Sequence, residues 1–211
     1  MKTIEAIRKL NGIAFSQRGL FATAQAQAAG VERYAISRLE KSGNVERLAK
    51  GVHRMGGAPS PREEDVLAAW LSIDPGRTLG DVTRGGAPVA MGATAAWLHE
   101  LGEIGPVPYE FCTEERRQTQ RANLRLRKRN LSPGDVTITA GIPATTPART
   151  VVDLIDEGED LSLVANVLND ALQRGLIADE ATLRAKVDMR GAAAGMPKGL
   201  GLYEAMTGRR P

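Results

Sequence analysis

The amino-acid sequence predicts an α+β protein with two domains, residues 1–57 and 60–211. Three short helices followed by a hairpin fill the first range, which is the element order of a winged helix-turn-helix. A Gly/Pro-rich linker separates the two ranges, and in the second range strands of alternating polarity mix with amphipathic helices. The predicted architecture is therefore an N-terminal winged helix-turn-helix followed by a mixed α/β domain.

Helix caps and turn residues predict the elements of the first domain in chain order. Thr3 and Thr23 are N-cap residues for the first two helices, and glycines end the second and third. The predicted elements are helices over residues 3–11, 23–29 and 32–42, then a hairpin of residues 44–48 and 52–55.

The linker, residues 56–59, is followed by a strong helix start. Ser60 is an N-cap, Pro61 occupies the first helical position and Glu63 the third, which together form a capping box. The remaining elements follow from hydrophobic periodicity. They are a loop over residues 76–88, helices over 90–101, 147–155, 161–174 and 180–190, strands over 109–113, 123–128 and 135–139, and a weakly structured tail over 192–211.

Composition excludes several classes of protein. The chain has 211 residues, of which 42% are hydrophobic and 25% charged, as in an ordinary globular protein. A single cysteine and two distant histidines provide neither a disulfide nor a metal-ligand spacing, and fit a reducing cytoplasm. Apolar runs are too short for a membrane helix, and catalytic or phosphate-binding motifs are absent from the sequence. We therefore expect no enzyme activity, no cofactor, no metal and no membrane contact.

Charge is distributed unevenly along the chain. Residues 1–60 hold ten Lys or Arg against four Asp or Glu, whereas residues 61–211 hold eighteen against twenty-one. A basic module joined to a weakly acidic one is typical of a protein whose first part binds a polyanion.

The third helix carries the side chains expected of a DNA-reading helix. On a helical wheel its basic and polar residues share one face, opposite Ala35, Ile36 and Leu39. The alternative is a solvated basic helix in a winged helix that binds protein. With the hairpin included, the candidate DNA-binding residues are Arg33, Tyr34, Ser37, Arg38, Lys41, Arg47, Lys50, His53 and Arg54.

A second basic cluster lies in the second domain and contains no acid. It allows three interpretations: an edge strand protected by charge, a second nucleic-acid surface, or a docking site for an acidic protein. Its members are Arg116, Arg117, Arg121, Arg125, Arg127, Lys128 and Arg129.

Other chemically capable residues have simpler interpretations. Cys112 lies in an alternating strand and is expected to be a buried small hydrophobe. His99, between Leu98 and Leu101 on a helix, is expected to be structural, and His53 is expected at the surface. The carboxylates between residues 153 and 160 are expected to form a solvated turn, not a metal site.

Several segments resemble the AbiEi-type antitoxins. The resemblance lies in residues 26–31, in the hairpin over residues 46–54, in residues 95–101 and above all in the segment Gly141–Leu154, which contains Thr-Thr-Pro-Ala-Arg-Thr. It covers the chain to about residue 190.

The resemblance implies the antitoxin of an abortive-infection (phage-defence) operon. In that family the winged helix represses the operon at inverted repeats in double-stranded promoter DNA. The C-terminal domain counteracts a nucleotidyltransferase-like toxin, with or without direct contact. The alternatives are a stand-alone transcriptional regulator with a ligand-sensing or oligomerising domain, and a nucleic-acid enzyme remnant, which would need an acidic metal site.

Two departures from the family pattern are visible. Long relatives carry a C-terminal nuclease-like domain, for which a chain ending at residue 211 has no room. Glu32 stands before the third helix, where Ser or Thr is the usual cap. Within Thr-Thr-Pro-Ala-Arg-Thr, we expect Thr146 to cap a helix and Arg149 to pair with Asp153.

Overall fold

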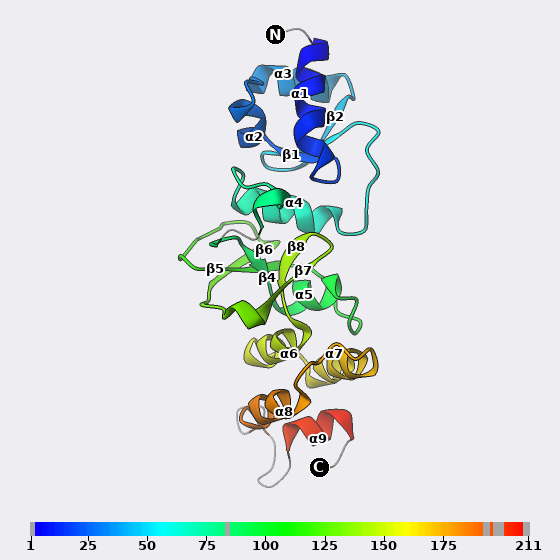
Figure 1. Ribbon diagram of the computed structural model, residues 1–211, viewed down its shortest axis with the longest axis vertical. Coiled ribbons are helices and arrows are strands. Elements are labelled where there is room, and N and C mark those ends of the chain that lie inside the picture. The colour runs from blue at the N-terminus through cyan, green and yellow to red at the C-terminus, as the bar shows by residue number, and fades with distance from the viewer. Residues whose placement is uncertain (1–2, 83–84, 192–194, 196–200, 209–211) are drawn as a thin grey trace. The chain divides into compact units, whose positions relative to one another are not determined.

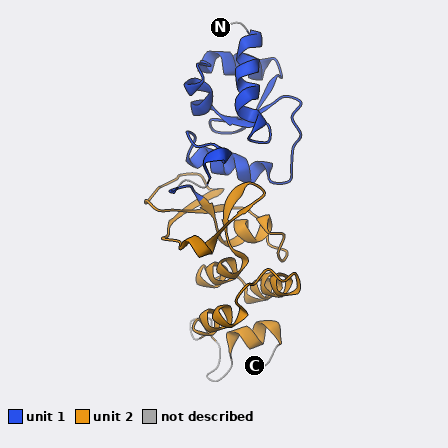
Figure 2. Cartoon of the chain, viewed as in Figure 1, with its two compact units in different colours: residues 1–88 blue, residues 89–211 orange. Residues whose placement is uncertain are grey.

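The structure, a computed structural model, describes residues 3–82, 85–191, 195 and 201–208 (Figure 1). The chain divides into two compact units, residues 1–88 and 89–211, coloured separately in Figure 2. The first unit contains a winged helix and the second a sheet with helices, so the predicted α+β fold class is confirmed.

Unit 1 begins with the three helices and the hairpin that the sequence predicts, plus one strand that it does not. Strand β1 pairs with β3, which makes an antiparallel three-stranded sheet of order β1-β3-β2. The apolar core beneath it includes Leu10, Phe21 and Leu39. The elements are α1 (Thr3–Phe15), β1 (Leu20–Ala22), α2 (Thr23–Ala28), α3 (Arg33–Lys41), β2 (Val45–Ala49) and β3 (Val52–Met55).

Two details of these elements differ from the sequence prediction. Helix α1 continues four residues beyond residue 11. Thr23 is the first residue of α2, not its cap: Ala22 precedes the helix, and the Ala22 N–H donates to Gln25 Oε1 (2.8 Å). At the tip of the hairpin Gly51 has φ +75°, a conformation that glycine adopts at no steric cost.

Helix α4 (Glu64–Ile73) follows the linker but starts three residues later than the capping box predicts. Ser60 does not cap the helix, because its hydroxyl donates to Glu64 Oε2 (2.9 Å). The helix lies in unit 1, where Arg18 contacts Glu63 (3.1 Å), and a 3₁₀ turn at Leu79–Asp81 follows it. The domain boundary at residues 57–60 remains a prediction.

Unit 2 is built on a five-stranded mixed sheet of order β6-β5-β4-β8-β7. The three predicted strands are present, and two further strands, β4 and β8, form the middle of the sheet. The predicted helix over residues 90–101 is wrong at both ends, because residues 89–90 pair in the sheet and the helix ends at Leu98. The elements are β4 (Val89–Ala90), α5 (Gly92–Leu98), β5 (Tyr109–Thr113), β6 (Leu124–Lys128), a 3₁₀ turn (Pro133–Asp135), β7 (Val136–Thr139) and β8 (Ile142–Thr145).

Four helices complete unit 2 and share one apolar core, which includes Val151, Leu168 and Tyr203. Asp160 and Asp179 accept backbone N–H groups at the starts of α7 and α8. The tail contains a helix that the sequence analysis missed, and tail residues 192–194, 196–200 and 209–211 lie outside the described residues. The helices are α6 (Pro147–Asp156), α7 (Leu161–Gln173), α8 (Glu180–Asp188) and α9 (Leu202–Thr207).

Candidate functional site

Helix α3 presents a basic face at the surface of unit 1. Ile36 and Leu39, on its other side, are buried in the core. Tyr34 is 71% exposed, and the Arg38 guanidinium lies over its ring at 5.9 Å. The predicted residues of this helix, all exposed, are Arg33, Tyr34, Ser37, Arg38 and Lys41. Glu32 occupies the N-cap position of α3 but makes no side-chain cap.

The hairpin adds two exposed cations. Lys50 lies at its tip and Arg47 on strand β2, where Arg47 Nε donates to the Ala49 carbonyl (3.4 Å). Arginines and lysines in these positions suit phosphate and base-edge contacts. Seven of the nine predicted DNA-binding residues are thus at the surface.

His53 is not a surface residue, and the sequence expectation for it is wrong. It is 5% exposed, and its ring stacks on Phe21 with centroids 5.2 Å apart. Its Nδ1 lies 2.8 Å from Glu40 Oε1 of α3, and its Nε2 lies 2.9 Å from the Thr23 hydroxyl of α2. Burial lowers the pKa of His53, while the Glu40 carboxylate opposes that shift. His53 therefore joins three elements inside the unit.

Arg54 also forms ion pairs within unit 1. Its guanidinium pairs with Glu46 of β2 and with Glu64 of α4, the latter at 3.0 Å. The hydrogen bond to Glu46 is the main reason that the pKa of Arg54 is raised. Glu64 is itself only 8% exposed, so the arginine compensates a largely buried charge.

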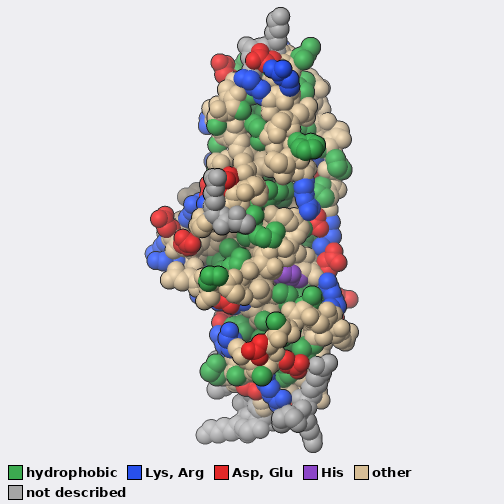
Figure 3. Space-filling view, in the orientation of Figure 1, with side chains coloured by type: hydrophobic (Ala, Val, Ile, Leu, Met, Phe, Trp, Pro, Cys, Tyr) green, Lys and Arg blue, Asp and Glu red, His purple; other side chains and the backbone are tan. Residues whose placement is uncertain are grey.

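The second basic cluster is partly neutralised within unit 2. Arg125 contacts Glu110 (3.2 Å), and Arg127 and Arg129 both contact Glu157. Arg116 and Lys128 are exposed and border an open groove of about 890 Å³ with their neighbours over residues 116–120 and 124–128. Strand β6, which carries much of the cluster, is an edge strand of the sheet. Figure 3 shows one face of the molecule, on which Lys and Arg lie in small groups among Asp and Glu.

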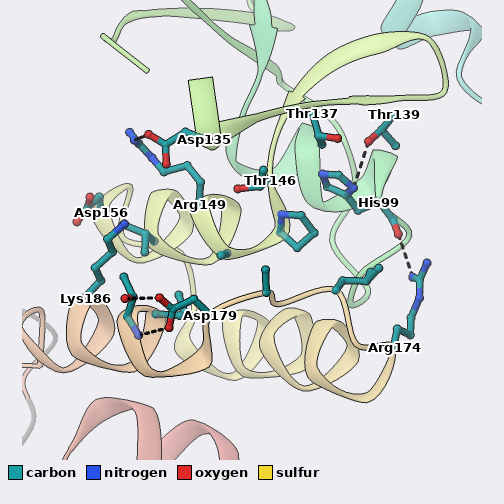
Figure 4. Close-up of a pocket in the computed structure, with 18 of the residues that line it drawn as sticks. His99, Asp135, Thr137, Thr139, Thr146, Arg149, Asp156, Arg174, Asp179 and Lys186 are labelled. Atoms are coloured by element: carbon teal, nitrogen blue, oxygen red, sulfur yellow. Dashed lines mark hydrogen bonds and ion pairs between the residues drawn. The ribbon is translucent and has the colours of Figure 1, made fainter. Parts of the chain in front are cut away.

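Unit 2 contains a cleft of about 930 Å³ that the sequence did not predict (Figure 4). Strand β7 contributes Thr137 and Thr139 to it, because alternate residues of a strand share a face. Helices α6 and α8 contribute further walls, and the apolar lining includes Leu176 and Met189, which are 39% and 74% exposed. Residues 146–149, which belong to the Thr-Thr-Pro-Ala-Arg-Thr segment of the sequence analysis, line the cleft. That segment was the one sequence feature that could have pointed to this site.

Most of the cationic side chains around this cleft already have partners. Arg149 binds Asp135 (3.3 Å) and Asp153 (2.9 Å), as the sequence predicts for Asp153. Arg190 binds Asp156 (2.6 Å), and Arg174 donates to the carbonyl oxygens of residues 99 and 100. Apolar side chains and satisfied charges therefore form this surface.

The ring of His99 is held by backbone and hydroxyl groups at the cleft wall. Its Nε2 donates to the Thr145 carbonyl (2.7 Å), and its Nδ1 lies 3.3 Å from the Thr139 hydroxyl. Burial lowers the pKa of His99, so the ring is neutral at pH 7. With both nitrogens engaged, His99 has the structural role that the sequence analysis expected.

Thr146 precedes α6 but makes no side-chain cap, contrary to expectation. The hydroxyl bond at this point joins Thr145 and Thr150, both fully buried (2.8 Å). The neighbouring carboxylates form a solvated turn only in part, because Asp156 and Asp160 are exposed whereas two others are not. Asp153 is 2% exposed, and burial raises its pKa, while Glu157 is occupied by two arginines.

Cys112 is 2% exposed on strand β5, and burial raises the pKa of its thiol to about 12. It is a buried small residue, as predicted.

Among the described residues, no group of three or more His, Cys, Asp or Glu is placed to hold a metal ion. In the same part of the chain, no helix is long and apolar enough to span a membrane.

Comparison with known proteins defines the class to which this winged helix and sheet domain belong. A family described as "Transcriptional regulator, AbiEi antitoxin" matches residues 13–55. A second, the "AbiEi antitoxin C-terminal domain", matches residues 88–197, which is more than half of the chain. The chain belongs to the AbiEi antitoxin family, a regulatory family of antitoxins with a DNA-binding role.

Curated proteins provide no match to this sequence. Among solved structures, the chain is similar to the one titled "Crystal structure of RV2827C protein from Mycobacterium tuberculosis". The two sequences are 17% identical, the match covers 98% of this chain and 81% of the other, and the TM-score is 0.46.

Proposed function

We propose that this chain is the antitoxin of an AbiE-like toxin–antitoxin system and represses its own operon through helix α3 and the wing. The observation that carries the DNA-binding part is the exposed basic face of α3, whose opposite side is packed into the winged-helix core. A helix with one basic, exposed face and one apolar, buried face fits a major groove, where Arg reads guanine and Lys binds phosphate. The proposed contacts are Arg33, Tyr34, Ser37, Arg38, Lys41, Arg47 and Lys50.

His53 and Arg54 are left out of the proposed interface. Their polar groups are occupied by Glu40, Thr23, Glu46 and Glu64. They support the proposed interface indirectly, because they fix the hairpin against the helices.

A gel-shift titration with the DNA upstream of the chain's own gene tests the DNA-binding part. Arg33→Ala with Arg38→Ala is expected to abolish the specific shift, since each bidentate contact contributes about 1–3 kcal/mol. Lys9→Ala with Arg62→Ala, which removes the same charge elsewhere in unit 1, is the matched control. Circular dichroism establishes that both variants are folded. Unchanged affinity of the α3 variant would disprove the recognition-helix assignment.

The second part of the proposal is that unit 2 counteracts a nucleotidyltransferase-like toxin encoded beside this gene. The family match over residues 88–197 supports this part. A cytoplasmic location and a role in phage defence go with it. The test expresses the neighbouring gene alone, with the full chain, and with the Arg33→Ala/Arg38→Ala chain from an independent promoter. Rescue by both chains is expected, and absence of toxicity or of rescue would refute the antitoxin proposal.

The second basic cluster fits either partner. Arg116→Ala with Lys128→Ala separates the two, because the loss of a DNA contact lowers the salt dependence of binding by about 0.9 for each phosphate that is no longer neutralised. A toxin contact instead reduces rescue and leaves the salt slope unchanged. If neither property changes, the cluster is the charged edge of the sheet.

The cleft favours one alternative function, a stand-alone transcriptional regulator that senses a small ligand in unit 2. Such a protein would have no toxic neighbour, and a cell extract of small molecules would change its DNA affinity. Rescue of a toxic neighbour by the full chain decides against this alternative.

A further inference from the structure

Helix α1 carries two large apolar side chains that the rest of the described structure leaves uncovered. Ile4 is 82% exposed and Phe15 is 91% exposed, whereas Ala6, Leu10 and Ala14 bury the other side of the helix. Single apolar residues are ordinary on a protein surface, so the arrangement of these two residues decides whether they form a contact surface.

The two residues belong to one stripe. Ile4, Arg8, Asn11 and Phe15 are spaced by four, three and four residues, all are exposed, and they fall within an arc of about 60°. This is the spacing of the contact positions in a pair of packed helices. We call these four residues the α1 stripe.

The α1 stripe has the same pattern of polarity in both directions: apolar, polar, polar, apolar. If a second copy of the helix packs antiparallel across a twofold axis, Ile4 of each copy faces Phe15 of the other. Arg8 then faces Asn11, so no like charges meet. A surface that is complementary to itself fits a second copy of the same chain better than an unrelated partner.

The stripe is separate from the proposed DNA-binding face. The α1 residues in the small groove beside α3 are Thr3 and Ala6, across from Arg38 and Lys41. None of the four stripe residues lines that groove. Occupation of the α3 face therefore leaves the stripe available.

We propose that the α1 stripe is the contact through which two copies of this chain pair antiparallel when they occupy neighbouring sites on DNA. The proposal rests on the proposed DNA binding by α3. The four apolar side chains of such a pair bury on the order of 500 Å², below the roughly 1,200 Å² of a stable complex. The α1 stripe alone is therefore not expected to hold two free chains together, and DNA supplies the high effective concentration that a weak contact needs.

Cooperative binding to the DNA upstream of the chain's own gene tests this pairing. Footprinting defines the protected sites, and fragments with one site or two are then titrated. The Ile4→Glu/Phe15→Glu chain places two glutamates opposite each other at both ends of the pair. The Ile4→Lys/Phe15→Glu chain, the matched control at the same positions, places lysine opposite glutamate. Wild type is expected to bind two sites with a cooperativity of about tenfold, within the usual range of coupling.

The expected result is loss of cooperativity in the Glu/Glu chain, its partial return in the Lys/Glu chain, and equal affinity of all three for one site. Equal cooperativity in all three chains overturns the pairing and leaves the DNA-binding function intact. If wild type does not bind a single site, the DNA-binding function and the pairing are both overturned. A Glu/Glu chain that binds cooperatively but no longer rescues toxicity assigns the stripe to the toxin instead.

Cross-linking tests the antiparallel geometry directly. An Ile4→Cys chain and a Phe15→Cys chain, distinguished by size, are expected to form a mixed disulfide on two-site DNA. Neither chain is expected to cross-link with itself, because residues 4 and 15 are about 16 Å apart along the helix and a disulfide needs Cα atoms within about 7 Å. The native Cys112 is buried and does not compete. Self-cross-linking of either chain overturns the antiparallel arrangement.

Discussion

His53 of strand β3 lies 2.8 Å from Glu40 of helix α3, so the wing and the proposed recognition helix meet at one buried imidazole. The Thr23 hydroxyl of helix α2 holds the other ring nitrogen (2.9 Å). Because a carboxylate only accepts and a hydroxyl can donate, a neutral ring with its proton on Nδ1 suits both neighbours. The contact spans the helices and the hairpin that must keep their geometry on DNA.

Glu40→Ala is expected to lower the free energy of unfolding by about 1–3 kcal/mol, because it leaves the imidazole without its anionic partner. Urea denaturation measures the change. Glu5→Ala, which removes an exposed carboxylate from α1, is the control and is expected to cost less than about 0.5 kcal/mol. Equal losses in the two variants would contradict a structural role for the Glu40–His53 contact.

Acidification from pH 7.5 to pH 5 is expected to destabilise the protein through its two histidines. Burial lowers the pKa of His53 and of His99, so the unfolded chain takes up these protons first as pH falls through about 6.5. The contribution of the two histidines to the free energy of unfolding is therefore fully present above that pH and is lost as the pH falls below it. Burial raises the pKa of Glu110 and Asp153, which acts in the opposite direction, so the comparison must be between variants.

Urea midpoints at pH 7.5, 6 and 5 provide that comparison for wild type and for His53→Gln with His99→Gln. The double variant is expected to show a smaller loss on acidification than wild type, whatever its stability at pH 7.5. A loss as steep as that of wild type would rule out the two histidines as its source.

Lys50 and Arg54 are close in sequence but are expected to behave differently. Lys50→Ala should lower the salt slope of DNA binding by about 0.9 and leave stability unchanged, because the proposed role of this exposed lysine at the hairpin tip is to contact a phosphate. Arg54→Ala should destabilise the protein by about 2 kcal/mol, because Glu64 is left buried and unpaired. Gel shifts at several salt concentrations and urea denaturation measure the two effects. An Arg54 variant with full stability and a reduced slope would reverse the assignment.

In unit 2, Arg149→Ala is expected to destabilise the protein by about 3 kcal/mol at pH 7.5, because Asp153 is 2% exposed and depends on that arginine. Arg149→Met with Asp153→Leu removes both charges and is expected to recover most of the loss. Urea denaturation of the three chains decides. A double variant as unstable as Arg149→Ala would show that packing, not the unpaired charge, accounts for the effect.

Local patterns were sufficient for several parts of the fold. The α3 helix follows from Ile36 and Leu39 at helical spacing, and β6 from the alternation of Leu124 and Leu126 with arginines. By contrast, β8 contains Pro143 and is buried on all sides, so neither alternation nor strand propensity marks it. It is a strand because it lies between two partners, β7 along its whole length and β4 through the parallel pairing of Ala90 with Ala144.

Residue type and periodicity were enough to predict the fold class, the family resemblance and a basic face on α3 and the hairpin, of which seven of the nine predicted residues are exposed. These depend on periodicity and residue type, which each segment carries within itself. The folded chain was needed to show which charges have partners, such as Arg54 with Glu46 and Glu64, and that His53 is buried between the helices and the hairpin. Such pairings depend on where distant segments meet, because an ionic side chain in a folded protein takes the nearest opposite charge in space, not in sequence.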